Sequence, residues 1–239
     1  TCVIYFAGLG AAGQFSKLAV SFLALRDVYG GPEATLGFAV SLISLVGMVL
    51  GLIAGMVVNR IGTKRALVGA LALGALVSVW QSLLPSLPWL MASRVIEGAS
   101  HLLIVVAAPT LIAETTTARL RPAALTLWST FFGVAFAMTA VVGPVLIGWG
   151  GLPALFLSHG LWMAVASVLC LWLLPTIAAP VTERLTLGSL LGRHARAYAT
   201  PGIAAPGFAW LCYTLTFVSV LTALPLLTNE TAPAWLAPL

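Results

Sequence analysis

Long apolar stretches alternate with short polar loops along the whole chain. Each stretch holds about the 17 to 25 mainly apolar residues that a helix needs to cross the hydrocarbon core of a bilayer. The stretches lack the strict alternation of apolar and polar positions that is typical of strands in a membrane barrel. The pattern therefore predicts an all-α membrane protein with seven transmembrane helices, over residues 2–25, 35–58, 66–84, 88–113, 122–148, 152–174 and 203–228.

The composition excludes a water-soluble helical protein with a large core. Hydrophobic residues make up 61% and charged residues 7% of the 239 residues, and the mean hydropathy is +1.09. A soluble domain would carry about 25% charged residues. We expect three parts, which are a six-helix transmembrane half at 1–175, a cytoplasmic connector at 176–202 and the first helix of a second half at 203–239. Because the sequence does not begin with Met and stops soon after the seventh stretch, we expect it to belong to a longer chain.

The positive charge of the chain indicates its orientation and not a nucleic-acid partner. The net charge is +5, and most basic residues lie in the loops after the second, fourth and sixth predicted helices, namely Arg60, Lys64, Arg65, Arg119, Arg121, Arg184, Arg193 and Arg196. Loops rich in Lys and Arg stay on the cytoplasmic side of a membrane. The sequence therefore predicts a cytoplasmic N-terminus and a lipid bilayer as the surrounding partner.

Three short motifs follow one another along the chain. The end of the second predicted helix and the loop after it contain Gly55-Met56-Val57-Val58-Asn59-Arg60-Ile61-Gly62-Thr63-Lys64-Arg65. This segment resembles the signature of the major facilitator superfamily, Gly-x-Leu-Ala-Asp-Arg-x-Gly-Arg-Lys, with Asn59 in place of aspartate and Thr63 in place of a basic residue. Two later segments are similar to the family's Arg-x-x-Gln-Gly and Gly-Pro-x-x-Gly-Gly elements, namely Arg94-Val95-Ile96-Glu97-Gly98 and Gly143-Pro144 with Gly148.

The resemblance implies a fold and a function. Members of the family are secondary transporters of two six-helix halves, each built from inverted three-helix repeats, which rock about a site near the bilayer midplane. By this resemblance we expect a small-molecule solute as partner, five further helices, a monomer when complete and a multi-pass protein of the bacterial inner membrane. In the family the signature aspartate latches one conformation, so Asn59 predicts a weaker latch here. Gly143 followed by Pro144 predicts a kink in the fifth helix, because proline removes a helical hydrogen bond.

Four ionisable residues lie within predicted transmembrane helices. They are Lys17 in the first helix and Arg94, Glu97 and His101 in the fourth, where a spacing of three and four residues places the last three on one face. Lys17 and Glu97 each lie about nine residues, or about 13 Å, from the outer ends of their helices. We therefore expect a Lys17–Glu97 ion pair flanked by Arg94 and His101, with Gln14 one turn away, along a substrate or proton pathway.

The charges of this cluster leave several functions open. Two cations against one carboxylate favour an anionic solute such as an organic acid, whereas Glu97 and His101 could instead carry protons, as in a drug–proton antiporter. Arg94 could also do no more than pin its helix to neighbouring backbone. A distant alternative is a rhomboid-like intramembrane serine protease using Ser100 and His159. The sequence contains no nucleotide-binding loop and no metal-ligand spacing, so we expect no cofactor and no metal.

Overall fold

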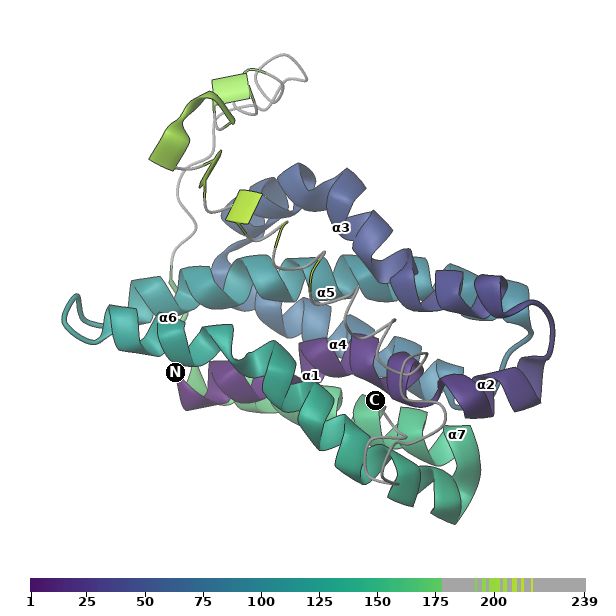
Figure 1. Ribbon diagram of the computed structural model, residues 1–239. Helices are drawn as coiled ribbons and strands as arrows, with labels where there is room; N and C mark the ends of the chain where they lie inside the picture. Colours follow the sequence, from purple (N-terminus) through teal and green to yellow (C-terminus); the bar gives the residue numbers. More distant parts are fainter. Residues whose placement is uncertain are drawn as a thin grey trace. The chain divides into compact units, whose positions relative to one another are not determined.

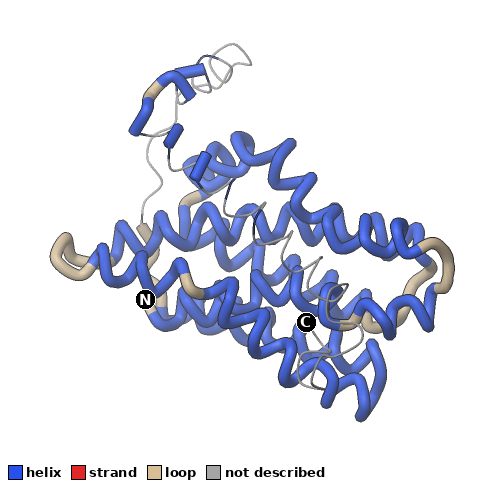
Figure 2. Tube along the Cα trace, viewed as in Figure 1, coloured by secondary structure: helices blue, strands red, loops and turns tan. Residues whose placement is uncertain are grey.

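The described part of the chain is helical. The computed structural model describes residues 1–177 and, beyond them, isolated short stretches between residues 192 and 216. The chain divides into two units, Thr1–Thr182 and Glu183–Leu239. In the part of the chain that is described, Figure 2 shows helices and loops without strands. The connector expected at 176–202 and the helix expected at 203–228 fall largely outside the described residues.

Seven helices make up the first unit (Figure 1). They are α1 (Cys2–Val20), α2 (Phe22–Tyr29), α3 (Glu33–Ile61), α4 (Thr63–Gln81), α5 (Leu87–Thr115), α6 (Arg121–Ser129) and α7 (Phe131–Leu173). In the described residues, five helical runs are long and apolar enough to cross a membrane, and the last of them extends over Arg121–Leu173. This run of 53 residues contains both of the spans that the sequence predicts at 122–148 and 152–174.

Two local breaks divide the helices, one inside the predicted span 2–25 and one in the gap predicted between residues 148 and 152. The first span ends at Val20, because Ser21 leaves the helical conformation with a ψ of +16°, and a separate helix begins at Phe22. The Ser21 hydroxyl bonds back to the Lys17 carbonyl oxygen (2.5 Å). Helix α7 runs through Gly143 and Pro144 and leaves helical dihedral angles at Gly150 and Gly151. Gly151 has a φ of +68°, a left-handed conformation that favours glycine. The turn between the fifth and sixth spans is therefore made by the glycine pair.

Helix α1 is the centre of the first unit. It packs against α7 and α5, while α4 packs against α7 and α3 against α5. Three glycines let neighbouring side chains reach the α1 backbone, since an added Cβ at Gly8, Gly10 or Gly13 would come within 2.6–2.7 Å of Trp128, Met163 or His159. Small residues commonly permit such close helix packing in membranes. The polar residues of α1 are consequently surrounded by protein.

The small-residue rows of the second and third spans differ in their surroundings. On α4 the residues Ala66, Ala70, Gly74 and Ser78 are all buried. On α3, a Cβ added to Gly47, Gly51 or Gly55 would meet no atom of the described chain within 4 Å. Only the α4 row is therefore a packing face within the first unit.

Candidate functional site

An ion pair lies inside the helix bundle at the position that the sequence predicts. Lys17 Nζ on α1 lies 2.6 Å from Glu97 Oε1 on α5, and the two side chains are 1% and 0% exposed. Charged groups are rarely buried in a membrane protein unless they are paired or wet. The ion pair expected from the sequence is thus confirmed by a direct contact, although α1 ends at Val20 and Lys17 lies in its last turn.

The ammonium group of Lys17 has a full set of acceptors. Besides Glu97, Nζ donates to Ser78 Oγ (2.7 Å) and Gln81 Oε1 (2.7 Å), both on α4. The three N–H bonds of a lysine allow three such contacts. The ring of Phe156 lies 5.4 Å from Nζ. The contact with Glu97 Oε1 is an ion pair without hydrogen-bond geometry, and Nζ also lies 3.4 Å from His159 Nδ1. Protein atoms therefore surround the ammonium group in this conformation.

Arg94 joins the second oxygen of Glu97 to the backbone of two other helices. Its Nη1 donates to Glu97 Oε2 and to the Gln14 carbonyl oxygen (2.9 Å), and its Nε donates to the Ala39 carbonyl oxygen on α3 (3.1 Å). Gln81 Nε2 also donates to Glu97 Oε2 (2.9 Å). Among the described residues, Arg94 Nη2 has no hydrogen-bond acceptor. Arg94 thus both pins the helices together and retains an unused, fully buried donor group.

Gln14 and His101 lie beside the ion pair without joining it directly. Gln14 Nε2 donates to Ser100 Oγ (3.1 Å), and its Oε1 has no donor among the described residues. His101 Nδ1 lies 3.0 Å from the Ala11 carbonyl oxygen, and its ring packs edge-on against Phe15. Since a carbonyl oxygen can only accept, Nδ1 carries the proton. The histidine predicted to flank the pair is therefore bonded to the α1 backbone.

Three polar residues of the cluster were not predicted from the sequence. Ser78 and Gln81 lie three residues apart on α4 and are both fully buried. His159 on α7 bonds to Ser78 and to the α1 backbone. The i, i+3 spacing of Ser78 and Gln81 is a signal that could have placed them on one face.

The structure does not form the serine and histidine pair that a protease needs. Ser100 Oγ donates to the Ala70 carbonyl oxygen (2.7 Å), whereas His159 Nδ1 is bonded to Ser78 (2.8 Å). Nucleophilic catalysis requires the base within hydrogen-bond reach of the serine. The protease alternative is therefore wrong for these two residues.

A lateral cavity reaches the cluster between α1 and α7. Its volume is about 170 Å³, and its lining is mostly apolar, with polar side-chain atoms from Lys17, Thr139, Ser158, His159 and Trp162. Gly143 also lines it, and a Cβ there would lie 3.3 Å from Val20 Cγ1. We call this space the α1–α7 cavity. Of the three charged residues of the cluster, Lys17 alone is part of its wall.

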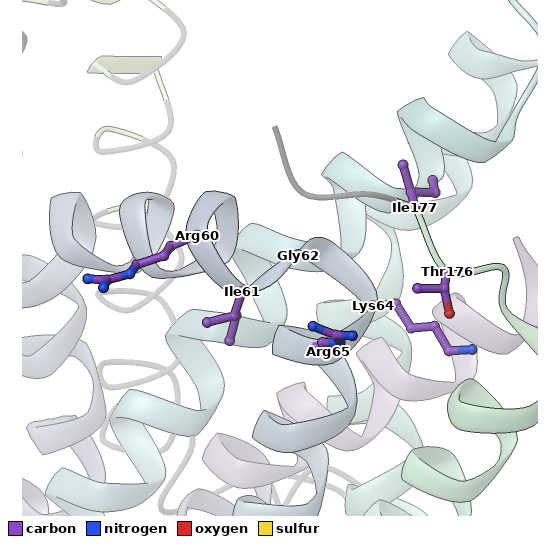
Figure 3. A pocket seen from close by; sticks show the side chains of 7 residues that line it. All are labelled: Arg60, Ile61, Gly62, Lys64, Arg65, Thr176 and Ile177. Carbon is purple, nitrogen blue, oxygen red and sulfur yellow. The ribbon is translucent and has the colours of Figure 1, made fainter. Parts of the chain in front are cut away.

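The signature motif lies at the junction of α3 and α4. Gly62 separates the two helices with a φ of +90°, a conformation that favours glycine. Lys64 Nζ donates to the Leu174 carbonyl oxygen (2.6 Å), and Arg60, Lys64 and Arg65 line a pocket of about 110 Å³ with Thr176 and Ile177. Figure 3 shows Arg60 pointing away from Lys64 and Arg65. Gly62 thus fixes the turn that presents these basic residues.

The other members of the motif differ in their exposure. Asn59 is exposed on the last turn of α3. Gly55 lies one turn earlier, and a Cβ added to it would meet no described atom within 4 Å. Thr63 Oγ1, at the first residue of α4, donates to Glu114 Oε2 on α5 (2.8 Å). This contact fastens the start of α4 to the end of α5. The side chain of Asn59 remains available to a partner outside the first unit.

Comparisons with known proteins agree with this arrangement. The family model of the Major Facilitator Superfamily matches residues 4–234. The chain is 28% identical over 213 residues to the inner membrane transport protein YajR of Escherichia coli K12, covering 89% of this chain and 46% of that protein. The structure of the proton:xylose symporter XylE bound to 6-bromo-6-deoxy-D-glucose shares the fold, with a TM-score of 0.62 and 19% identity over 71% of this chain and 43% of that one.

The chain spans less than half the length of each of these two relatives. Both relatives are described as transport proteins and neither as an enzyme. The family model covers nearly the whole sequence, and the described helices have the apolar length of membrane spans. The chain therefore belongs to the Major Facilitator Superfamily.

Proposed function

We propose that the protein is a secondary active transporter that moves a small solute by alternating access and is coupled to a proton or ion gradient. The observation that carries this proposal is the buried Lys17–Glu97–Arg94 cluster, which joins the last turn of α1 to α5 inside the helix bundle. Ionisable groups at this depth are costly and commonly mark solute or proton pathways. The family membership supports the same conclusion.

The charge balance of the cluster favours an anionic solute, for example an organic acid. Two cations face one carboxylate, and Lys17 has spent its donors on protein atoms. Arg94 Nη2 is the donor left without a partner among the described residues, although the side chain is fully buried. A guanidinium group matches the geometry of a carboxylate well. We propose that Arg94 receives the carboxylate of the solute, with Gln14 and His101 lining the same pathway.

The orientation and the conformational latch belong to the same proposal. We place the protein in the bacterial inner membrane with its N-terminus in the cytoplasm, so that the basic junction of α3 and α4 faces the cytoplasm. Asn59 there accepts a hydrogen bond from a second six-helix half of the same chain, reached through the connector at 176–202. The complete protein works as a monomer.

Counterflow in proteoliposomes tests the proposal. Vesicles containing the protein are loaded with unlabelled succinate, xylose or tetraphenylphosphonium, and the uptake of the same labelled compound is measured at two pH values. We expect exchange of succinate. An Arg94→Gln variant should need roughly 10- to 100-fold more succinate for half-maximal uptake, because it loses a charged hydrogen bond of about 1.5–3 kcal/mol.

Arg119→Gln is the matched control, because Arg119 is an exposed arginine in the loop after α5. Its half-maximal concentration should equal that of the wild type. Exchange of tetraphenylphosphonium in place of succinate would show a drug–proton antiporter and would disprove the anionic preference. Exchange of none of the three compounds would count against solute transport itself.

A further inference from the structure

A continuous row of hydrogen-bonding groups leads from the buried ion pair to His159. Lys17 Nζ donates to Ser78 Oγ (2.7 Å), and Ser78 Oγ lies 2.8 Å from His159 Nδ1. Lys17 Nζ itself is 3.4 Å from the same nitrogen. Glu97, Lys17, Ser78 and His159 therefore form one chain of contacts that crosses from α5 through α1 and α4 to α7.

The partners of His159 determine which nitrogen carries its proton. Nε2 lies 2.8 Å from the Gly10 carbonyl oxygen, which can only accept, so Nε2 is the protonated nitrogen of the neutral ring. Nδ1 then presents a lone pair to the Ser78 hydroxyl. That hydroxyl has a second acceptor in the Phe156 carbonyl oxygen (3.1 Å). A small rotation of one hydroxyl thus makes or breaks the contact between Ser78 and His159.

His159 also lies where the cluster meets the α1–α7 cavity. It lines the cavity together with Lys17, and the other lining residues are not ionisable. The ring fits there because residue 13 is glycine, since an added Cβ would lie 2.7 Å from His159 Cδ2. The remaining titratable groups near the row are Arg94, Glu97 and His101 on α5, whereas α4 presents the neutral Ser78 and Gln81.

We propose that His159 relays protons between the buried Lys17–Glu97 pair and the α1–α7 cavity, with the Ser78 hydroxyl as the intermediate carrier. The proposal rests on the proposed function, because it names the route by which that transporter is coupled to a proton gradient. The cavity serves water and protons, while the solute is bound from the Arg94 side of the cluster.

The transfer balances in protons and charge. One proton leaves Lys17 Nζ for Ser78 Oγ as the Ser78 hydroxyl proton moves to His159 Nδ1, which gives a neutral lysine and an imidazolium ion. The imidazolium ring then turns away from the Gly10 carbonyl oxygen and releases its Nε2 proton to a water molecule in the cavity, which leaves a neutral ring protonated on Nδ1. Glu97 keeps its charge and stays paired with Arg94. The same steps in reverse return the proton.

The row carries one positive charge at a time, either on Lys17 or on His159. An ammonium and an imidazolium group 3.4 Å apart would repel each other inside the bundle. His159 can accept the proton because Lys17 gives it up in the same step. A glutamine at position 159 offers a matched test, since its amide can donate to Gly10 and accept from Ser78 but cannot carry a proton.

The experiment compares the wild type with His159→Gln in proteoliposomes, using succinate as the probe. Counterflow measures exchange without net proton movement, and accumulation driven by an imposed pH gradient measures coupling. We expect the variant to keep counterflow within about two-fold of the wild type and to lose at least ten-fold in proton-driven accumulation. Full accumulation by the variant would show that His159 only positions its neighbours and would overturn the relay.

A second measurement does not depend on the solute. In a background with Cys2, Cys170 and Cys212 replaced by serine, single cysteines at 158 and 157 are treated with the water-soluble thiol reagent MTSES. Ser158 lines the cavity, whereas the adjacent Leu157 is 52% exposed and does not line it. We expect Ser158→Cys to react. We expect Leu157→Cys to remain unmodified until the protein is denatured, because an exposed residue of a spanning helix outside the cavity faces lipid, which excludes the charged reagent.

The two measurements separate the relay from the transport activity. An unreactive cysteine at 158 would show a dry cavity and would overturn the relay even if counterflow is normal. Absence of counterflow in the wild type would disprove the proposed function with succinate, and reaction at 158 but not at 157 would then still support an aqueous entrance beside His159.

Discussion

Removing the carboxylate of Glu97 should destabilise the bundle more than removing its lysine partner. At the observed 2.6 Å, the attraction between the two charges is about 6 kcal/mol for an effective dielectric constant of about 20. Desolvation offsets part of this attraction, so removing one partner of a buried pair typically costs about 3–5 kcal/mol. Glu97→Gln leaves both Lys17 and Arg94 without an anion among their contacts. We expect Glu97→Gln to lower the free energy of unfolding by about 3–5 kcal/mol.

Lys17→Met is expected to cost less, because Glu97 then keeps Arg94 and the amide of Gln81 as donors. The loss is that of hydrogen bonds to a charged group, roughly 1–3 kcal/mol. The double variant should be more stable than Glu97→Gln alone, because it removes one of the two cations that Glu97→Gln leaves uncompensated. The free energy of unfolding should therefore be higher for the double variant than for Glu97→Gln alone.

The assay is reversible unfolding in mixed micelles with increasing SDS, followed by the fluorescence of the eight tryptophans. Asp27→Asn is the control, because Asp27 is exposed and its change should stay within about 0.5 kcal/mol. If the free energies of the two single variants simply add in the double variant, the two charges do not interact and the reasoning is wrong. The expected result is a coupling that exceeds the cost of Lys17→Met, which is roughly 1–3 kcal/mol.

Three further predictions follow from individual contacts. Gly13→Ala should cost about 1–3 kcal/mol in the same unfolding assay, because its Cβ displaces His159, whereas Gly69→Ala, which meets no described atom, should be neutral or stabilise by up to about 1 kcal/mol. Arg94→Lys should lower the unfolding free energy by about 1–3 kcal/mol despite its retained charge, because an ammonium cannot reach acceptors on three helices at once. Asn59→Asp should change the ratio of inward-open to outward-open molecules by about two- to five-fold, a charge–dipole effect of roughly 0.3–1 kcal/mol, and spin-label distances that do not change would refute it.

The helical class and the central ion pair could be predicted because both depend on local rules. Bilayer thickness sets the length of the apolar stretches, and the helical rise converts residue numbers into depth. Lys17 and Glu97 were matched by such counting alone, and their contact at 2.6 Å confirms the estimate. The neighbours of the pair required knowledge of which helices touch, which residue counting does not provide.

Neutral polar residues were the main gap in the sequence-based prediction of the site. Ser78, Gln81 and His159 lie near the outer ends of their spans, where polar residues are also favoured by the membrane interface. Their role becomes visible only when α1, α4 and α7 pack around the same point. The break at Ser21 was missed for a related reason, since a single backbone conformation decides it. The break at Gly150 and Gly151 lies in the gap that the sequence predicts between residues 148 and 152.

The saturation of Lys17 has a consequence for how such a transporter could recognise an anion. A solute that competed for Lys17 would have to displace Glu97, Ser78 or Gln81, each of which is fully buried. An anion that binds Arg94 Nη2 displaces no hydrogen-bond partner among the described residues, although the packing around this buried group must open to admit it. Such binding still adds negative charge close to Glu97 and so weakens the hold of Arg94 on the carboxylate. The negative charge of Glu97 is then stabilised mainly by the ammonium group of Lys17. Binding of the solute and protonation of Lys17 are therefore coupled, and so is proton transfer along the row from Lys17 to His159.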